Sequence, residues 1–275
     1  MLTVLRRFGI YERLRATWVY DLYWWVRDPA RTVNRREEIE FYRNLLVGFC
    51  PGDLIFDVGA NVGMKTGIFL RLGARIVAVE PDKNNQEVIR EKFLKYRLTP
   101  KPVTIVGKAL SDRNGVESMW IDGPGSALNT FSKKWVETLR LDKARFAHTM
   151  DKLEFAGQAE VETTTLEHVI AAYGVPFYIK IDVEGHEPSV LRGLQHPVPY
   201  LSFEVNLPEF RPEGLECVDL LGRLDAGGAF NYTSDTERGL AEKRWLDRGE
   251  FSQFLDHSPD KTIEVFWKSS ESKGR

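Results

Sequence analysis

Short apolar runs alternate with amphipathic stretches along the chain from residue 54 onward. The apolar runs predict strands at residues 54–58, 76–80, 103–106, 177–182, 201–205, 229–233 and 262–267, with further extended pieces at 116–121 and 161–164. Apolar residues at helical spacing predict helices at 64–72, 84–96, 133–153, 166–173, 187–194, 217–224 and 250–255. Strands that alternate with helices are typical of a parallel sheet built from β-α-β units. We therefore predict a doubly wound α/β fold.

No internal repeat or linker divides this pattern, so the predicted strands belong to one domain over residues 46–270. Residues 1–45 precede it and are predicted to form a helical extension. A stretch rich in Gly, Pro, Ser and Asn at residues 122–130 predicts a loop inside the domain.

A glycine loop, D-V-G-A-N-V-G at residues 57–63, follows the first predicted strand. Gly59 and Gly63 allow a tight turn and the close approach of a ligand, so both are candidate cofactor-binding residues. Asn61 stands where the dinucleotide fingerprint has its second glycine, which disfavours a pyrophosphate and thus a nicotinamide-dependent oxidoreductase. Asp57 at the end of the strand is placed to pair with a cationic group of a ligand.

Glu80 ends the second predicted strand, where a carboxylate can accept hydrogen bonds from both hydroxyls of a ribose. Together with the acidic glycine loop, this favours S-adenosylmethionine, which is cationic at its sulfur and its amine. The alternative is that the glycines only make a turn and that Glu80 is a solvated strand end.

The segment I-K-I-D-V-E-G-H-E at residues 179–187 places three carboxylates and a histidine within six residues at the rim of the same crevice. Like charges at this density are unfavourable unless a cationic ligand, a metal ion or a proton offsets them. We expect Glu187 to be structural, near the start of the next helix, and Asp182 to be functional.

Four motifs together resemble the FkbM-type family of S-adenosylmethionine-dependent methyltransferases: D-V-G-A-N-V-G at 57–63, V-E-P-D at 79–82, A-L-S-D at 109–112 and I-K-I-D-V-E-G-H-E-P-S-V-L-R-G at 179–193. The resemblance implies a Rossmann-like methyltransferase fold whose seven-stranded sheet has an antiparallel last strand. It also implies methyl transfer to a hydroxyl of a sugar, glycan or natural product. By position, Asp57, Gly59, Asn61 and Glu80 would contact the methionine and ribose parts, Ser111 would lie by the adenine, and Asp182 by the sulfonium.

Methyl transfer to a hydroxyl needs a base, and His186, Asp182 and Glu184 are the candidates. His186 has an ordinary pKa of about 6.5, which we expect the neighbouring carboxylates to raise. It is equally well explained as a surface residue at the start of a helix. An alternative hypothesis is that Asp182, Glu204 and Asn206 hold a divalent metal ion through oxygen ligands. A module that binds the cofactor without turnover is a further alternative.

The formal charge of the whole chain is −2, which argues against a dedicated nucleic-acid-binding protein. Residues 1–36, however, carry eight arginines against three acidic residues, a net of +5. Within them, Tyr11, Leu14, Trp18, Leu22 and Trp25 follow at helical spacing. This basic aromatic helix is predicted to pack on the domain or on a second subunit, or to rest on an anionic membrane near its acceptor.

The chain has only two cysteines, too few for a disulfide framework, and no stretch typical of a signal peptide or a membrane span. We therefore expect a cytoplasmic protein whose partner is a small-molecule or glycan acceptor.

Overall fold

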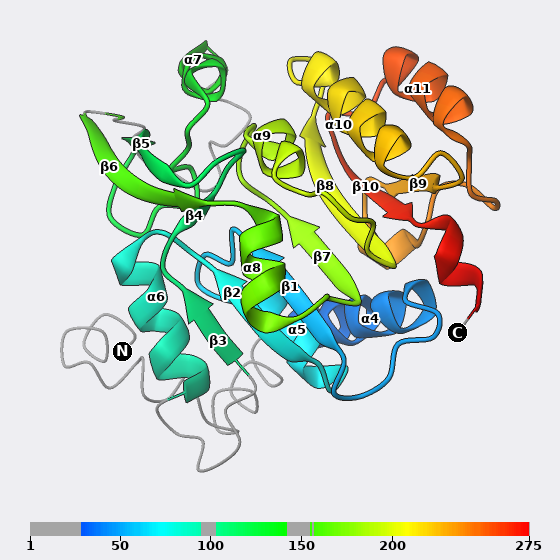
Figure 1. Ribbon diagram of the computed structural model, residues 1–275, viewed down its shortest axis with the longest axis horizontal. Helices are drawn as coiled ribbons and strands as arrows, with labels where there is room; N and C mark the ends of the chain where they lie inside the picture. Colours follow the sequence, from blue (N-terminus) through cyan, green and yellow to red (C-terminus); the bar gives the residue numbers. More distant parts are fainter. Residues whose placement is uncertain (1–28, 95–102, 142–154, 156, 275) are drawn as a thin grey trace.

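A seven-stranded sheet forms the centre of the computed structural model, which describes residues 29–94, 103–141, 155 and 157–274 (Figure 1). The strand order is β3-β2-β1-β7-β8-β10-β9. The strands are β1 (Leu54–Val58), β2 (Arg75–Val79), β3 (Val103–Val106), β7 (Tyr178–Ile181), β8 (Tyr200–Asn206), β9 (Ala229–Thr233) and β10 (Thr262–Lys268). Strand β10 runs antiparallel to β8 and β9, and the other pairs are parallel. The predicted doubly wound, mostly parallel sheet with an antiparallel last strand is confirmed.

Helices cover both faces of this sheet because successive strand residues point to opposite sides. In β1, Phe56 and Val58 pack into one apolar cluster and Ile55 into the other. The first face is covered by α8 (Leu166–Tyr173), α9 (Glu187–Arg192), α10 (Arg211–Leu224) and α11 (Arg248–His257). The second face is covered by α4 (Pro29–Leu45), α5 (Met64–Arg71) and α6 (Lys83–Ile89). The strands read as nearly continuous apolar runs because both faces are buried.

A second, three-stranded sheet has the order β4-β6-β5 and lies at one end of the main sheet (Figure 1). It consists of β4 (Ala109–Leu110), β5 (Gly115–Ile121) and β6 (Gly157–Thr164). The extended pieces predicted at 116–121 and 161–164 are thus paired with each other, in antiparallel register. The loop predicted at 122–130 follows β5 and leads into α7 (Lys133–Leu141).

Several predicted helices differ from the structure at their ends. Helix α10 begins at Arg211, six residues before the predicted start, because Pro212 is well tolerated in the first helical turn. The helix predicted at 84–96 is α6 followed by a π-helical turn, Arg90–Leu94, and its last two residues lie outside the described part. Residues 142–153 of the helix predicted at 133–153 also lie outside it.

Helix α4 is the described part of the predicted N-terminal extension. Phe41, Tyr42 and Leu45 bury their side chains against the second face of the sheet. The basic aromatic stripe predicted between Tyr11 and Trp25 lies outside the described residues. Among the helices that the structure describes, none is long and apolar enough to span a membrane.

Candidate active site

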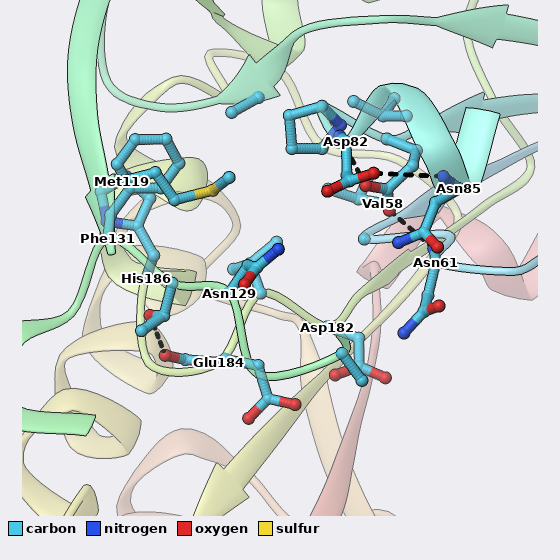
Figure 2. A pocket seen from close by; sticks show the side chains of 18 of the residues that line it. Val58, Asn61, Asp82, Asn85, Met119, Asn129, Phe131, Asp182, Glu184 and His186 are labelled. Carbon is cyan, nitrogen blue, oxygen red and sulfur yellow. Dashed lines mark hydrogen bonds between the residues drawn. The ribbon is translucent and has the colours of Figure 1, made fainter. Parts of the chain in front are cut away.

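A pocket opens at the carboxyl ends of β1, β2 and β7, where ligands bind in open α/β sheets. Its walls come from these strand ends, from α6 and the second sheet, and from residues 122–131, which we call the roof segment. The lining residues are Val58, Gly59, Asn61, Val79, Glu80, Pro81, Asp82, Asn85, Ala109, Leu110, Met119, Ser126, Ala127, Asn129, Thr130, Phe131, Asp182, Val183, Glu184 and His186. Figure 2 shows Asp82 and Asn85 across the pocket from Met119, Phe131 and His186.

Gly59 lets the loop after β1 lie directly against the end of β7. Its φ is +76°, and a Cβ at this position would collide with the carbonyl oxygen of Asp182. Only glycine fits such an approach in the left-handed region. Asn61, two residues later, is also left-handed, with φ 48°. The glycine loop therefore has one fixed shape at the floor of the pocket.

Glu80 is the buried carboxylate of the pocket and is 5% exposed. Its Oε2 accepts the backbone N–H of Asn61 at 2.7 Å, and its Oε1 accepts that of Asp82 at 2.8 Å. Burial raises the pKa of Glu80 to about 7, although both hydrogen bonds oppose the rise. Since each carboxylate oxygen has a second lone pair, a fixed Glu80 can still accept two ligand hydroxyls.

The roof segment is attached to both sides of the pocket. At one side, the backbone N–H of Gly125 donates to Asp82 Oδ2 at 3.0 Å. At the other side, the Thr130 hydroxyl donates to the carbonyl oxygen of Glu184 at 2.7 Å, drawn as a dashed line in Figure 2. The side chain of Asn129 bonds back to Gly123 and Asp122 and so stabilises the loop itself.

Lys180 is a buried cation beneath the carboxylates, and it is 3% exposed. Its Nζ donates to Asp182 Oδ2 at 2.7 Å. Burial lowers the pKa of Lys180, but the charges of Asp182, Glu264 and Glu204 outweigh burial and raise the pKa well above its usual value. Lys180 therefore remains charged and holds Asp182 at the pocket.

Glu184 lies in the turn between β7 and α9 with φ 53°, an uncommon conformation for a residue with a side chain. Its carboxylate lines the pocket and has no hydrogen-bond partner among the described residues. Burial raises the pKa of Glu184 well above its usual value, and the charges of Asp182 and Glu204 add to the rise.

Glu187 has a different task in the same turn. Its Oε1 accepts the backbone N–H groups of Val183 at 3.1 Å and Gly185 at 3.2 Å. It is 5% exposed and does not line the pocket. Its contacts are those of a side chain that shapes the turn.

The pKa of His186 is lowered, so the expected rise is wrong. Burial is the larger effect and outweighs the nearby charges of Glu117 and Asp112. His186 Nε2 lies 3.3 Å from Ser111 Oγ, and the ring centroid lies 4.9 Å from that of Phe131. The imidazole is thus a neutral wall of the pocket, bonded away from Glu184.

The sequence of the chain is similar to that of known methyltransferases. The family described as "Methyltransferase FkbM domain" matches residues 57–224. The 31-O-demethyl-FK506 methyltransferase FkbM of Streptomyces tacrolimicus is 30% identical over 218 residues, which are 70% of this chain and 79% of that protein. The chain belongs to the FkbM methyltransferase family.

Two further proteins resemble parts of this FkbM-family methyltransferase. A solved structure, methyltransferase FkbM from Methylobacillus flagellatus, has a TM-score of 0.52 at 15% identity and shares the fold. The match covers 84% of this chain but only 47% of that one. The ribosomal RNA small subunit methyltransferase A of Thermotoga petrophila is 38% identical over 50 residues, which are 18% of this chain and 19% of that protein.

The structure brings most of the predicted residues of this FkbM-family site to one pocket: Gly59, Asn61, Glu80, Asp182, Glu184 and His186. Three others lie behind its walls. Asp57 is buried and accepts the Thr66 hydroxyl at 2.5 Å, and burial raises its pKa. Gly63, at φ +71°, precedes α5 and faces Phe93. Ser111 is buried and bonds His186 rather than lining the pocket.

The lining residues that the sequence did not point to are Asn85, Met119 and, in the roof segment, Ser126, Ala127, Asn129 and Thr130. They lie on or next to the second sheet and α6. These elements reach the pocket through contacts between segments that are far apart in the sequence. The buried Lys180 was also missed, although a lysine between two isoleucines in a predicted strand was a usable signal.

Two of the three hypothetical metal ligands, Asp182 and Glu204, lie near the side-chain cation of Lys180 instead. Asn206 turns its Nδ2 toward Glu204 Oε1 at 3.2 Å, and its Oδ1 accepts the Thr262 hydroxyl at 3.0 Å. Asp182 is paired with Lys180. Within the described ranges, no three His, Cys, Asp or Glu side chains form a group that could hold a metal ion. This donor set therefore does not fit a divalent ion as it stands.

Proposed function

We propose that this FkbM-family chain uses S-adenosylmethionine to methylate a hydroxyl oxygen of a sugar, glycan or natural product. The observation that carries the proposal is the position of Glu80. Its carboxylate is fixed by two backbone N–H groups at the pocket wall and retains lone pairs for a ribose diol. A phosphate-binding loop is not needed for this ligand, in keeping with Asn61 at the place of a glycine.

The other pocket residues fit the remaining parts of the same ligand. Met119, Leu110 and Ala109 give the same pocket an apolar lining, against which an adenine can pack. Asp182, held by Lys180, places a carboxylate where the cationic methionine part would lie. When bound, S-adenosylmethionine supplies the methyl group and leaves as S-adenosylhomocysteine.

Glu184 is best placed to take the proton from the acceptor hydroxyl. Its carboxylate has no hydrogen-bond partner in the described part of the chain, and burial raises its pKa, which strengthens it as a proton acceptor. Asp182 is tied to Lys180, and His186 bonds Ser111. Of the three predicted candidates, Glu184 has the free oxygen atoms that a hydroxyl group requires.

The acceptor class rests on the relatives. The Streptomyces tacrolimicus relative is named as a methyltransferase of 31-O-demethyl-FK506. The name of that compound indicates an oxygen atom, at position 31, that lacks its methyl group. We extend to this chain only the class, a hydroxyl group on a sugar-like or natural-product framework.

The test is methyl transfer by the full chain from radiolabelled S-adenosylmethionine to a panel of monosaccharides, oligosaccharides and 31-O-demethyl-FK506. Acceptor-dependent label in an O-methyl product supports the proposal. Binding of S-adenosylhomocysteine without transfer to any acceptor would favour a non-catalytic module. Absence of binding would overturn the cofactor assignment.

A further inference from the structure

Thr130 joins the roof segment to the turn that carries Glu184. The Thr130 side chain is buried, and its Oγ1 donates to the carbonyl oxygen of Glu184 at 2.7 Å. The same Oγ1 accepts the backbone N–H of Ser132 at 2.9 Å, which orients the hydroxyl. Both hydrogen-bonding roles of this hydroxyl are therefore occupied by backbone groups.

The backbone of Thr130 is fixed independently of its side chain. It forms an antiparallel bridge with Trp120, with hydrogen bonds of 3.0 Å from Thr130 N and 2.7 Å to Thr130 O. Phe131 then packs its ring on His186. The hydroxyl thus projects from a hydrogen-bonded β-bridge toward the turn.

The turn needs such a restraint because Glu184 is left-handed. A left-handed residue with a side chain is strained and persists only where its surroundings hold it. Glu187 holds the N–H groups of Val183 and Gly185 from the inner side. Among the described residues, Thr130 donates the hydrogen bond to the carbonyl of Glu184 itself.

We infer that Thr130 is a positioning residue, which holds the Glu184 carboxylate at the pocket by bonding the Glu184 backbone from the roof segment. The role of Glu184 as a base rests on the proposed function, but the restraint on the turn does not. The roof segment is also bonded to Asp82 through the backbone N–H of Gly125, so the segment that holds the Glu184 turn contacts the opposite side of the pocket as well.

Hydrogen–deuterium exchange of the full chain tests the restraint without an acceptor. Thr130→Val removes the hydroxyl but keeps the branched shape, and it should speed exchange in residues 182–187 about five- to tenfold. Thr130→Ser, which keeps the hydroxyl, should restore slow exchange. Thr163→Val is the matched control: it removes a buried hydroxyl in the second sheet that donates to the Arg113 carbonyl, and it should leave the turn unchanged.

The inference would be overturned if the turn exchanged equally fast in Thr130→Val and in the unmodified chain. It would also be overturned if the turn of Thr130→Ser exchanged as fast as that of Thr130→Val.

A second experiment measures methyl transfer to the best acceptor from the panel. There, Thr130→Val should lower kcat about tenfold or more with little change in S-adenosylhomocysteine affinity. In a Glu184→Gln background it should have no further effect, since Thr130 acts through Glu184. If the chain binds no S-adenosylhomocysteine, the proposed function fails while the exchange result still decides the role of Thr130.

Discussion

Lys180 Nζ lies 2.7 Å from Asp182 Oδ2, and this ion pair places a buried cation directly under the floor of the pocket. Glu204 and Glu264 also act on Lys180, so one ammonium group offsets several carboxylates. The cluster of carboxylates at residues 182–187, which suggested a cationic ligand, is thus neutralised in part by Lys180. What remains for a ligand is the free carboxylate of Glu184 and the fixed carboxylate of Glu80.

Replacement of Lys180 by methionine should destabilise the fold. It leaves Asp182 and its neighbours without their cation, and breaking a buried pair in this way costs about 3–5 kcal/mol. We expect the lower end, about 3 kcal/mol, because the Asp182 side chain is 33% exposed and can gain water. The free energy of unfolding, measured by chemical denaturation, checks this.

Lys133→Met is the matched control, since Lys133 pairs with Glu137 on the surface and is 74% exposed. Its effect should stay below about 1 kcal/mol. The double variant Lys180→Met/Asp182→Asn should recover part of the lost stability, because it removes the nearest orphaned charge. A Lys180→Met protein as stable as the unmodified chain would show that this pair is not the restraint on Asp182.

Replacement of Glu184 by glutamine should abolish most turnover and spare cofactor binding. The amide keeps the shape but cannot take a proton, and loss of a general base slows a reaction by about 10²- to 10⁴-fold. The rate of methyl transfer to the acceptor found in the panel and the affinity for S-adenosylhomocysteine are the two measurements. The surface variant Glu162→Gln, with a side chain 65% exposed, should change neither. Full activity in Glu184→Gln would return the role of base to Asp182 or His186.

Stability should fall as the pH rises from about 4.5 to about 7, in part because of Glu187. Burial raises the pKa of Glu187 to about 7, whereas the unfolded chain has the ordinary value of 4.5. Between these values the folded state binds the extra proton, so stability is full below the unfolded pKa and is lost as the pH rises through the folded one. Glu80 at about 7 and Glu204 at about 8 act in the same direction.

Denaturation of the unmodified chain and of Glu187→Gln at about pH 5, 6, 7 and 8 measures this contribution. Glutamine keeps an oxygen for the N–H groups of Val183 and Gly185 but does not titrate. The variant should therefore show a shallower decline, by at most about 1.4 kcal/mol per pH unit within this window. Parallel curves for the two proteins would mean that Glu187 does not carry a raised pKa.

The features that followed from the sequence are those set by local order along the chain. Strand ends are marked by apolar runs, and a glycine loop after the first strand fixes where Gly59 and Asn61 lie. Glu80 ends the neighbouring strand, so parallel pairing brings it to the same edge of the sheet. These residues do meet in one pocket.

The features that did not follow depend on contacts between distant segments. Thr130 and Glu184 are 54 residues apart, and no local pattern pairs them. The short strand β4 and the second sheet depend on long-range pairing in the same way. The direction of the His186 pKa shift was wrong because charges can be counted along the sequence, whereas the burial that outweighs them cannot.

The central claim, a cofactor site built on Glu80, is tested most directly by calorimetric titration of the full chain with S-adenosylhomocysteine. The unmodified chain should bind it, NAD should not bind, and Glu80→Ala should weaken binding about a hundredfold through loss of two hydrogen bonds to a charged group. Glu87→Ala, on the exposed side of α6, should bind as the unmodified chain does. An unmodified chain that does not bind S-adenosylhomocysteine, or a Glu80→Ala variant that binds it equally well, would contradict the account.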